Sequence, residues 1–256
     1  MRLFLAGRTV LDAAGNDEEL TGPYDASVVE RTFRVLRLAP DPKILDVGCG
    51  KGQMLMRAVE LFDGKGTGVD LDLGEARERL RRRGMQERIE LMEGDANELT
   101  VGHGFDLTMC VGATHVFGGY EQTLNRLLEM TMPGGHLIVG EGYWEREPSD
   151  DALRILGASR DELGSLAGLV NLAVSHGLTP LTMHTSDQQQ WDEYEFSWAR
   201  GLTDYAAGHS DDSEVTEMQE LAAGHLAGYL NGYRGLLGFA IVACQVPLGS
   251  PTPARV

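Results

Sequence analysis

Three aspartates stand at the ends of successive apolar segments, and the first one precedes a glycine-rich turn. Asp46 lies in ILDVGCGKG, Asp70 ends GTGVD, and Asp95 follows RIELMEG. If these segments are parallel strands, the three carboxylates share the edge of the sheet where open α/β sheets bind ligands. There a carboxylate can accept hydrogen bonds from ribose hydroxyls or an adenine amino group, or can lie beside a cation.

The glycine-rich turn by itself leaves the ligand open. Gly48, Gly50 and Gly52 have the spacing GxGxG, whereas a dinucleotide fingerprint would place its third glycine at Gln53, and a phosphate-binding P-loop pattern is absent. Asp46 is an unfavourable neighbour for a pyrophosphate and a favourable one for a cation. A single aspartate can be a turn or helix-capping residue, but three in register favour a binding site.

Further chemistry-bearing residues follow the fourth and fifth apolar segments. Thr114 and His115 lie in CVGATHVFGG, and Glu141 lies in GEGYWE. His115 can accept a proton near neutral pH, or it can simply hydrogen-bond the loop backbone. Glu141 can orient an acceptor or act as a base, or it can pair with backbone amides. We take His115 and Glu141 as catalytic candidates and Thr114, Tyr143 and Trp144 as substrate contacts.

The elements that position these residues follow from the hydrophobic pattern. Apolar segments alternate with helical segments, which predicts an α/β fold with a doubly wound, Rossmann-like, seven-stranded and mostly parallel sheet. The expected strands are KILDVG, GTGVDLD, RIELMEGD, FDLTMCVG, GGHLIVGEGYW, LTPLTMHT and GFAIVACQV. The helical stretch before the last strand is too long for a simple connection. We expect residues 1–40 to form a lead-in and helix, 41–186 with 236–247 the sheet domain, and 187–235 a helical cap over the acceptor site.

The segment WDEYEFSW carries aromatic residues on one face of the expected cap. Trp191, Tyr194 and Trp198 recur at i, i+3 and i+7. They form either the core of the cap or a surface for a planar or cationic acceptor. The interspersed acidic residues favour a cation, so we include the three aromatic residues among the substrate contacts.

Composition excludes several classes of protein. The chain has 256 residues, with 22 Lys and Arg against 39 Asp and Glu, so its net charge is −17, which disfavours nucleic acid as a partner. Three cysteines without a CxxC pair argue against disulfides, and the histidines show no metal-ligand spacing. The basic cluster ARERLRRRG, residues 76–84, is expected to be a solvated helix face. With no secretory signal or membrane-spanning stretch apparent, we expect a soluble cytoplasmic protein, a monomer or a homodimer.

Five segments together resemble the ordered motif set of class I S-adenosylmethionine-dependent methyltransferases. They are ILDVGCGKG, GVDLD, EGDANEL, FDLTMCVGA and MPGGHLIVGE, and they span about residues 40–142. The remainder is similar to bacterial small-molecule methyltransferases in GATHVFGG, GEGYW and SDQQQWDEYEFSWAR. The motif [DN]PP[YF], typical of enzymes that methylate exocyclic amines, is absent, as is a Pro-Cys nucleophile.

The resemblance implies S-adenosylmethionine as the cofactor and assigns a role to each motif. The three glycines let the backbone approach the cofactor, Asp46 lies near its amino-acid moiety, Asp70 holds the ribose and Asp95 holds the adenine. The remaining expected cofactor contacts are Tyr24, Leu71, Ala96 and Cys110.

The expected function is methyl transfer to a small molecule by in-line displacement, for which a general base is optional. One alternative is a non-catalytic module that binds the cofactor. Another is a nicotinamide-dependent oxidoreductase, which Gln53 and the absence of a Tyr-x-x-x-Lys pair disfavour.

Overall fold

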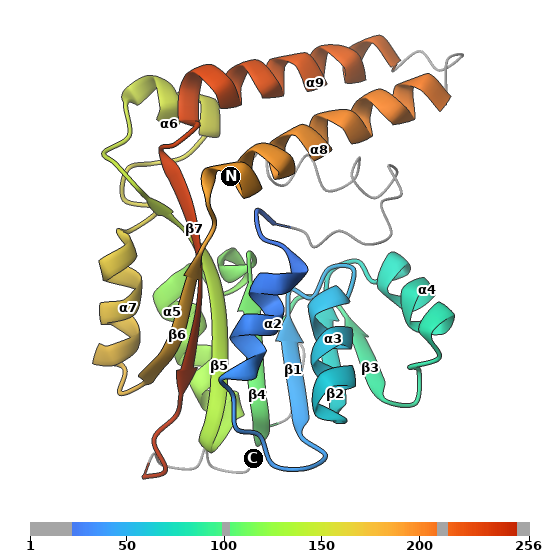
Figure 1. Cartoon of the computed structure of the whole chain (residues 1–256), viewed down its shortest axis with the longest axis vertical. Coiled ribbons are helices and arrows are strands. Elements are labelled where there is room, and N and C mark those ends of the chain that lie inside the picture. The colour runs from blue at the N-terminus through green and yellow to red at the C-terminus, as the bar shows by residue number, and fades with distance from the viewer. Residues whose placement is uncertain (1–21, 99–102, 209–214, 250–256) are drawn as a thin grey trace. The chain divides into compact units, whose positions relative to one another are not determined.

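The computed structural model describes residues 22–98, 103–208 and 215–249, with the backbone alone at 205–208 and 215–218. These residues divide into two compact units, which we call the sheet unit and the helical unit. The sheet unit comprises the described residues of 26–142, 166–185 and 239–249. The helical unit comprises the described residues of 22–25, 143–165 and 186–238. Helices and strands carry the labels of Figure 1.

A seven-stranded sheet is the centre of the sheet unit (Figure 1). Its strands are β1 (Lys43–Val47), β2 (Lys65–Asp70), β3 (Ile89–Glu93), β4 (Phe105–Val111), β5 (Thr131–Trp144), β6 (Thr179–Thr185) and β7 (Leu237–Gln245). The order is β3-β2-β1-β4-β5-β7-β6. Strands β1 to β5 pair in parallel, and β7 runs antiparallel to β6. The predicted doubly wound, mostly parallel sheet is therefore confirmed.

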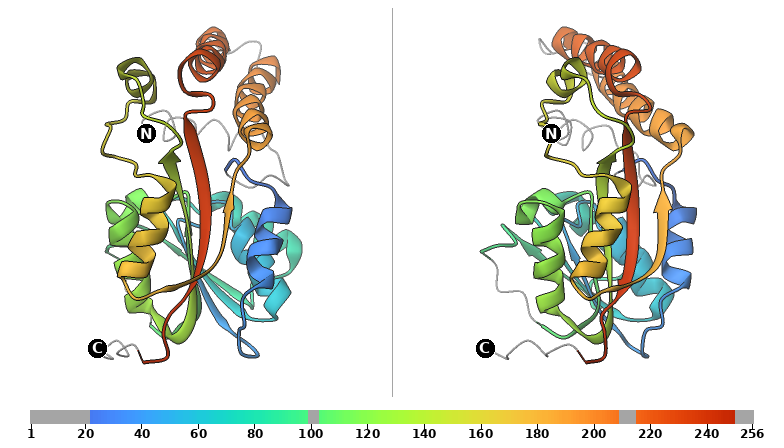
Figure 2. Two further views of the ribbon diagram at one scale, coloured as in Figure 1. Left: turned by 60° about the vertical axis from the view of Figure 1, so that its left-hand side comes forward. Right: turned by 90° about the vertical axis from the view of Figure 1, so that its left-hand side faces the viewer.

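Helices cover both faces of this sheet (Figure 2). The helices on one face are α2 (Ala26–Arg34), α3 (Gln53–Phe62) and α4 (Gly74–Arg83), and those on the other are α5 (Tyr120–Met130) and α7 (Leu166–Ser175). Helix α3 packs on β1 and β2, and α5 packs on β4. Because both faces are covered, the central strands carry continuous apolar residues rather than an alternating pattern. Ile44, Leu45, Leu107 and Met109 are accordingly inaccessible to solvent.

The helical unit contains a pair of long helices that follow β6 in the chain. Helices α8 (Gln188–Gly208) and α9 (Val215–Gly228) pack against each other, and the π-helix η2 (Tyr229–Tyr233) leads from α9 towards β7. The core of the pair consists of Trp198, Ala199, Leu202 and Ala222, with Leu226 at its margin. Helix α6 (Asp150–Leu156) packs against η2.

The helical insertion between β6 and β7 is thus present, and the helical unit also takes in residues 143–165, which the sequence assigned to the sheet domain. The expected division into lead-in, sheet domain and a cap over the acceptor site stays a prediction. Among the described residues, no helix has the length and apolar character that a membrane span requires.

Candidate functional site

The turn between β1 and α3 brings the backbone close to two neighbouring strands. The backbone N–H groups of Gly48 and Cys49 donate to the carbonyl oxygen of Val69 in β2, at 2.8 and 3.1 Å. Gly48 has φ +71°, and a Cβ atom there would lie 2.2 Å from the Cβ of Ala113, which follows β4. Any side chain at this position would collide with Ala113, so the close approach requires glycine.

Asp70 joins this turn to the end of β2. Its Oδ2 accepts a hydrogen bond of 2.7 Å from the backbone N–H of Gly50, and Oδ1 accepts one of 3.4 Å from that of Asp72. The residue is 5% exposed. A carboxylate at this end of a strand can accept hydrogen bonds from the two hydroxyls of a ribose.

Asp46 lies in β1 beside this turn, and its carboxyl group has an unusually high pKa. It is 3% exposed and lies in register with Gly68 of β2 and Met109 of β4. Burial, and then the charge of Asp70, raises the pKa of Asp46 from 3.8 to about 8. A carboxyl group whose ionisation is disfavoured by burial and by a neighbouring carboxylate makes a site that a cation stabilises. A sulfonium or ammonium group therefore fits here, and a phosphate does not.

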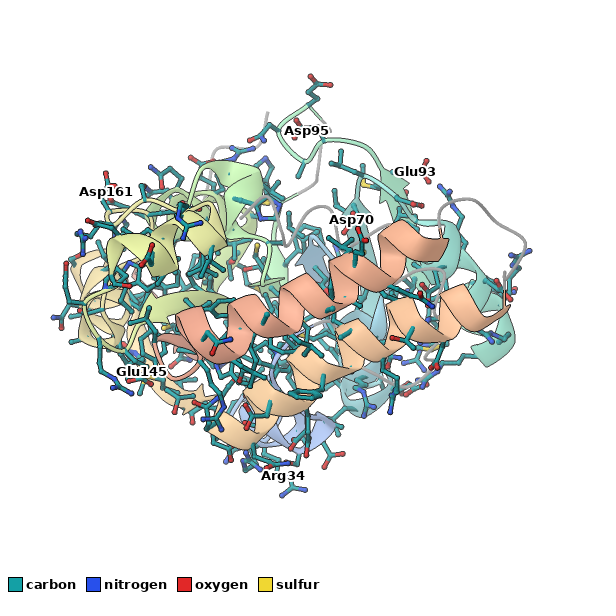
Figure 3. The ribbon with its side chains drawn as sticks, turned by 90° about the horizontal axis from the view of Figure 1, so that it is seen from above. Arg34, Asp70, Glu93, Asp95, Glu145 and Asp161 are labelled. Carbon is teal, nitrogen blue, oxygen red and sulfur yellow. The ribbon has the colours of Figure 1, made fainter. Side chains whose placement is uncertain are left out.

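Asp95 lies in the turn after β3, farther out than Asp70 in the view of Figure 3. Its Oδ1 accepts hydrogen bonds from the backbone and side-chain nitrogens of Asn97, at 2.8 and 2.9 Å. Asn97 also donates to the carbonyl oxygen of Val116 at 2.8 Å, which ties this turn to the segment after β4. The next residue, Ala96, is buried, whereas Leu71 is 68% exposed. The predicted adenine contacts of these residues stay predictions.

Thr114 and Glu141 come together at the ends of β4 and β5. Val111 is in register with Gly140, and the Thr114 hydroxyl donates a hydrogen bond to Oε2 of Glu141. Glu141 Oε1 accepts a hydrogen bond of 2.7 Å from the backbone N–H of Gly142. Both oxygens of this carboxylate are therefore anchored.

Thr114 opens a short 3-10 helix, η1 (Thr114–Phe117), that also contains His115. The carbonyl oxygen of Thr114 accepts a hydrogen bond of 3.0 Å from the backbone N–H of Gly119 and one of 3.2 Å from the Thr123 hydroxyl. His115 is half-buried. The turn is therefore held at its first residue, and η1 presents the histidine next to the anchored threonine.

Two further buried groups lie among these carboxylates. Burial, followed by the charges of Asp46 and Glu141, raises the pKa of the Cys110 thiol in β4 well above its usual value. Cys110 is therefore uncharged at neutral pH. Tyr120 was missed from the sequence, where its position at the start of α5 marks it only as a core residue. Its pKa is raised by burial first and then by Cys244 and Glu141, and its hydroxyl has no hydrogen-bond partner in the described part of the chain.

The basic cluster of α4 is not solvated throughout. Arg79 is 5% exposed and pairs with Glu75, whose Oε2 lies 3.1 Å from Nζ of Lys51 in the glycine-rich turn. These three residues tie α4 to the turn, while Arg77 and Arg83 pair at the surface. No group of three His, Cys, Asp or Glu suited to a metal ion occurs among the described residues.

The other expected substrate contacts belong to the helical unit. Tyr143 is 2% exposed and donates its hydroxyl to Glu145 at 2.6 Å, and Trp144 donates its indole N–H to the carbonyl oxygen of Arg160 at 3.0 Å. Tyr24 belongs to this unit too. The places predicted for these three residues beside acceptor or cofactor stay predictions.

The aromatic residues of α8 have mixed surroundings. Trp198 lies in the core between α8 and α9, Trp191 is 4% exposed, and Tyr194 is half-buried with its ring edge-on to that of Trp191. The neighbouring Asp192 is paired with Arg234 at 2.7 Å. Because this acid already has a cationic partner, it favours a cationic acceptor less than the sequence suggested.

Comparison with known proteins shows which proteins this chain resembles. Residues 44–135 match the family model described as methyltransferase domain. The uncharacterized protein YjhP of Escherichia coli is 28% identical over 209 residues, which cover 80% of this chain and 84% of that protein. A solved structure of YjhP superposes with a TM-score of 0.82, at 26% identity, and covers 92% of this chain and 98% of that chain.

A second similar solved structure is that of a protein with a named activity. It is a SAM-dependent methyltransferase from Geobacter sulfurreducens in complex with S-adenosyl-L-homocysteine, with a TM-score of 0.83 and 26% identity over 92% of this chain and 97% of that chain. Residues 44–135 of this chain thus match a methyltransferase domain, and the chain has the fold of class I S-adenosylmethionine-dependent methyltransferases. The resemblance seen in the five sequence motifs is confirmed, and so is the fold class that it implied.

The residues predicted for the site lie in both units. The sheet unit brings together Asp46, Asp70, the glycine-rich turn and Cys110, together with the pair Thr114 and Glu141. The helical unit contains all five aromatic residues expected at the acceptor.

Proposed function

We propose that this methyltransferase binds S-adenosylmethionine in the sheet unit and transfers its methyl group to a small-molecule acceptor. The observation that carries the proposal is the buried pair of carboxylates at the glycine-rich turn, Asp46 and Asp70. The first has a pKa raised to about 8 by burial and by the second, and the second is bonded to the turn itself. This arrangement suits an adenosyl group attached to a positive sulfur.

The residues that the sequence predicts at the cofactor hold it. Gly48, Gly50 and Gly52 let the backbone approach, Asp70 accepts from the ribose hydroxyls, and Asp46 lies beside the cationic part. When bound, S-adenosylmethionine supplies an electrophilic methyl group on a positively charged sulfur. The structural likeness to a methyltransferase crystallised with S-adenosyl-L-homocysteine supports this assignment.

Glu141 and Thr114 act on the acceptor. The Glu141 carboxylate is held by the Thr114 hydroxyl and by the Gly142 backbone, so its orientation is fixed. A fixed carboxylate can orient a nucleophile or accept its proton as the methyl group is transferred. His115, the residue after Thr114, is the second group that can accept this proton. Cys110 is kept protonated by burial and by its acidic neighbours, so we assign it no nucleophilic role.

A small molecule is the acceptor class that the charge favours. The chain carries a net charge of −17, which repels a polyanion such as nucleic acid at long range. The identity of the methylated atom does not follow from the sheet unit, because a fixed carboxylate serves oxygen, nitrogen and carbon nucleophiles alike.

Calorimetry with S-adenosylmethionine and S-adenosyl-L-homocysteine tests the cofactor assignment. We expect binding at about micromolar level, and a loss of about tenfold or more in Asp70→Ala, since a charged acceptor is removed from the site. Asp72→Ala is the matched control, because Asp72 is an exposed carboxylate two residues away. Absence of binding to both compounds contradicts the proposal.

Turnover of methyl-labelled S-adenosylmethionine with a panel of small acceptors then tests catalysis. Transfer of label to at least one acceptor is the expected result. If the chain binds the cofactor tightly and transfers label to none of a broad panel, a non-catalytic cofactor-binding module is the better description.

A further inference from the structure

One face of α8 carries a glutamate between two tryptophans. Trp191, Glu195 and Trp198 follow one another at i, i+4 and i+7, and they are 4%, 1% and 6% exposed. Side chains four residues apart in a helix are neighbours on one face. A carboxylate buried among indole rings is costly unless its oxygens are hydrogen-bonded.

Only part of this carboxylate is satisfied. Oε2 of Glu195 accepts a hydrogen bond from Nε2 of His225 on α9, and the His225 ring lies over that of Trp198, with 4.0 Å between the ring centroids. Tyr233 of η2 also interacts with Glu195, since burial, then the Glu195 charge and then a side-chain hydrogen bond with Glu195 raise the pKa of Tyr233. Helix α9 and η2 therefore hold the carboxylate in place from one side.

Two buried polar atoms on this face remain unmatched. Among the residues that the structure describes, Glu195 Oε1 and Trp191 Nε1 have no hydrogen-bond partner. The first is an acceptor and the second is a donor. Leaving each buried and unpaired costs about 1–3 kcal/mol, so native proteins rarely keep such atoms without a reason.

We propose that Glu195 and Trp191 bind the hydroxyl group of an apolar or aromatic molecule. A hydroxyl can donate its hydrogen to Glu195 Oε1 and accept the N–H of Trp191 at the same oxygen. An ammonium group has no lone pair for the indole N–H, and an ether has no hydrogen for the carboxylate. Of these three groups, only the hydroxyl can complete both atoms at once.

The surroundings suit the rest of such a molecule. The rings of Trp191 and Trp198 provide an apolar environment, and half-buried Tyr194 lies edge-on to Trp191, with 6.2 Å between the ring centroids. Asp192 is already neutralised by Arg234, so the cluster does not select for a cation. That the bound alcohol is the methyl acceptor rests on the proposed function, whereas its binding to the helical unit does not.

The test measures binding to the full chain of matched probes, by ligand-detected NMR and calorimetry, with and without saturating S-adenosyl-L-homocysteine. The probes are benzyl alcohol and 2-naphthylmethanol, each with its methyl ether and its ammonium analogue. We expect each alcohol to bind about tenfold or more tightly than its ether and its ammonium analogue, as a hydrogen bond to a charged group predicts.

Two substitutions locate the site. Trp191→Phe keeps a ring and removes the N–H, and Glu195→Gln removes the charge. Each is expected to weaken the alcohols about tenfold and to abolish their advantage over the ethers. Glu193→Gln is the matched control, since Glu193 is an exposed glutamate of the same helix, and it should bind the alcohols as the unmodified chain does.

The inference is overturned if no alcohol binds better than its ether, which is also the result expected if only a water molecule fills the position. It is overturned as well if the preference survives in Trp191→Phe, a variant that should fold even where Glu195→Gln does not. Failure to bind S-adenosyl-L-homocysteine would refute the proposed function. The preference for alcohols over ethers, measured in the absence of S-adenosyl-L-homocysteine, would still support the present inference.

Discussion

The Thr114 hydroxyl donates a hydrogen bond to the Glu141 carboxylate and so joins the residue that opens η1 to the end of β5. The pairing of Val111 with Gly140 in the sheet sets this relationship, because it places the two following segments side by side. With its second oxygen bonded to the Gly142 backbone at 2.7 Å, Glu141 has a fixed orientation.

Removing this carboxylate should impair methyl transfer more than cofactor binding. In Glu141→Gln we expect kcat to fall about 100-fold, the usual effect of losing a positioned acid or base. In Thr114→Val we expect a fall of about tenfold, because the carboxylate keeps its charge but loses its orientation, and Thr114→Ser should restore most of it. Steady-state kinetics with a responsive acceptor measures this.

S-adenosyl-L-homocysteine affinity is the control for those variants and should change less than threefold, a factor worth less than about 1 kcal/mol. Glu90→Gln, at an exposed glutamate of β3, should leave kcat unchanged. If Thr114→Val and Thr114→Ser lose the same activity, the hydrogen bond does not orient Glu141.

Asp46 should make the protein less stable as pH rises. In the folded chain the Asp46 carboxyl group keeps its proton up to about pH 8, whereas in the unfolded chain it loses the proton near pH 3.8. The stabilising effect of the bound proton is complete below the lower pKa and is lost as pH rises through the higher one. Asp46→Asn removes this dependence, so its free energy of unfolding relative to the unmodified chain should rise by at least about 1 kcal/mol between pH 5 and pH 8.

Urea titrations without cofactor, at pH 5, 6.5 and 8, measure that difference. Asp106→Asn is the control, because it replaces another carboxylate of the same sheet, at a half-buried position in β4. Parallel pH profiles for Asp46→Asn and the unmodified chain would mean that the Asp46 carboxylate is ionised in the folded state.

Gly48 should be intolerant of a methyl group for two separable reasons. Gly48→Ala requires a side chain at φ +71° and a Cβ 2.2 Å from that of Ala113. We expect a loss of about 3 kcal/mol in the free energy of unfolding, together with loss of cofactor binding. Thermal and urea unfolding measure the first effect, and calorimetry measures the second.

Gly84→Ala is the matched control for that substitution. Gly84 has a similar φ of +66°, and nothing lies within 4 Å of a Cβ atom placed there. Its substitution should cost only the left-handed backbone conformation, about 1 kcal/mol. Equal losses in the two variants would show that the contact with Ala113 has no part in the effect.

The ion pair between Asp192 and Arg234 should stabilise the helical unit modestly and in a pH-dependent way. The hydrogen bond from Arg234 is the main cause of the lowered pKa of Asp192, about 2 instead of 3.8. This stabilisation is complete above the unfolded pKa and is lost as pH falls through the folded one. Because the side chains are 28% and 42% exposed, we expect Asp192→Asn to cost only about 1 kcal/mol at pH 7.

Urea unfolding at pH 7 and near pH 2.5 tests that prediction, and the difference should shrink at the lower pH. Asp150→Asn is the control, because Asp150 pairs with Arg160 at 2.9 Å but is 97% exposed. It should cost almost nothing, and an equal loss in both variants would contradict the argument from burial.

The amino-acid sequence by itself determined the sheet and one side of the site. Strands β1, β2 and β3 could be predicted because short apolar segments between helical ones encode a parallel sheet. Asp46, Asp70 and the glycines could be picked out because the carboxyl ends of parallel strands meet at one edge. These are local patterns whose spatial consequence is fixed by the fold class.

The tertiary structure alone decided which side chains have partners. The pairing of Thr114 with Glu141 depends on the register of β4 and β5, and the burial of Arg79 against Glu75 depends on how α4 packs beside the glycine-rich turn. The sequence placed Glu195 merely among several acids, and only the packing of α8 on α9 shows it buried with one oxygen matched and one unmatched. Hydrogen bonds between distant segments have no local sequence signal, because they depend on a few tenths of an ångström in the packing of whole helices and strands.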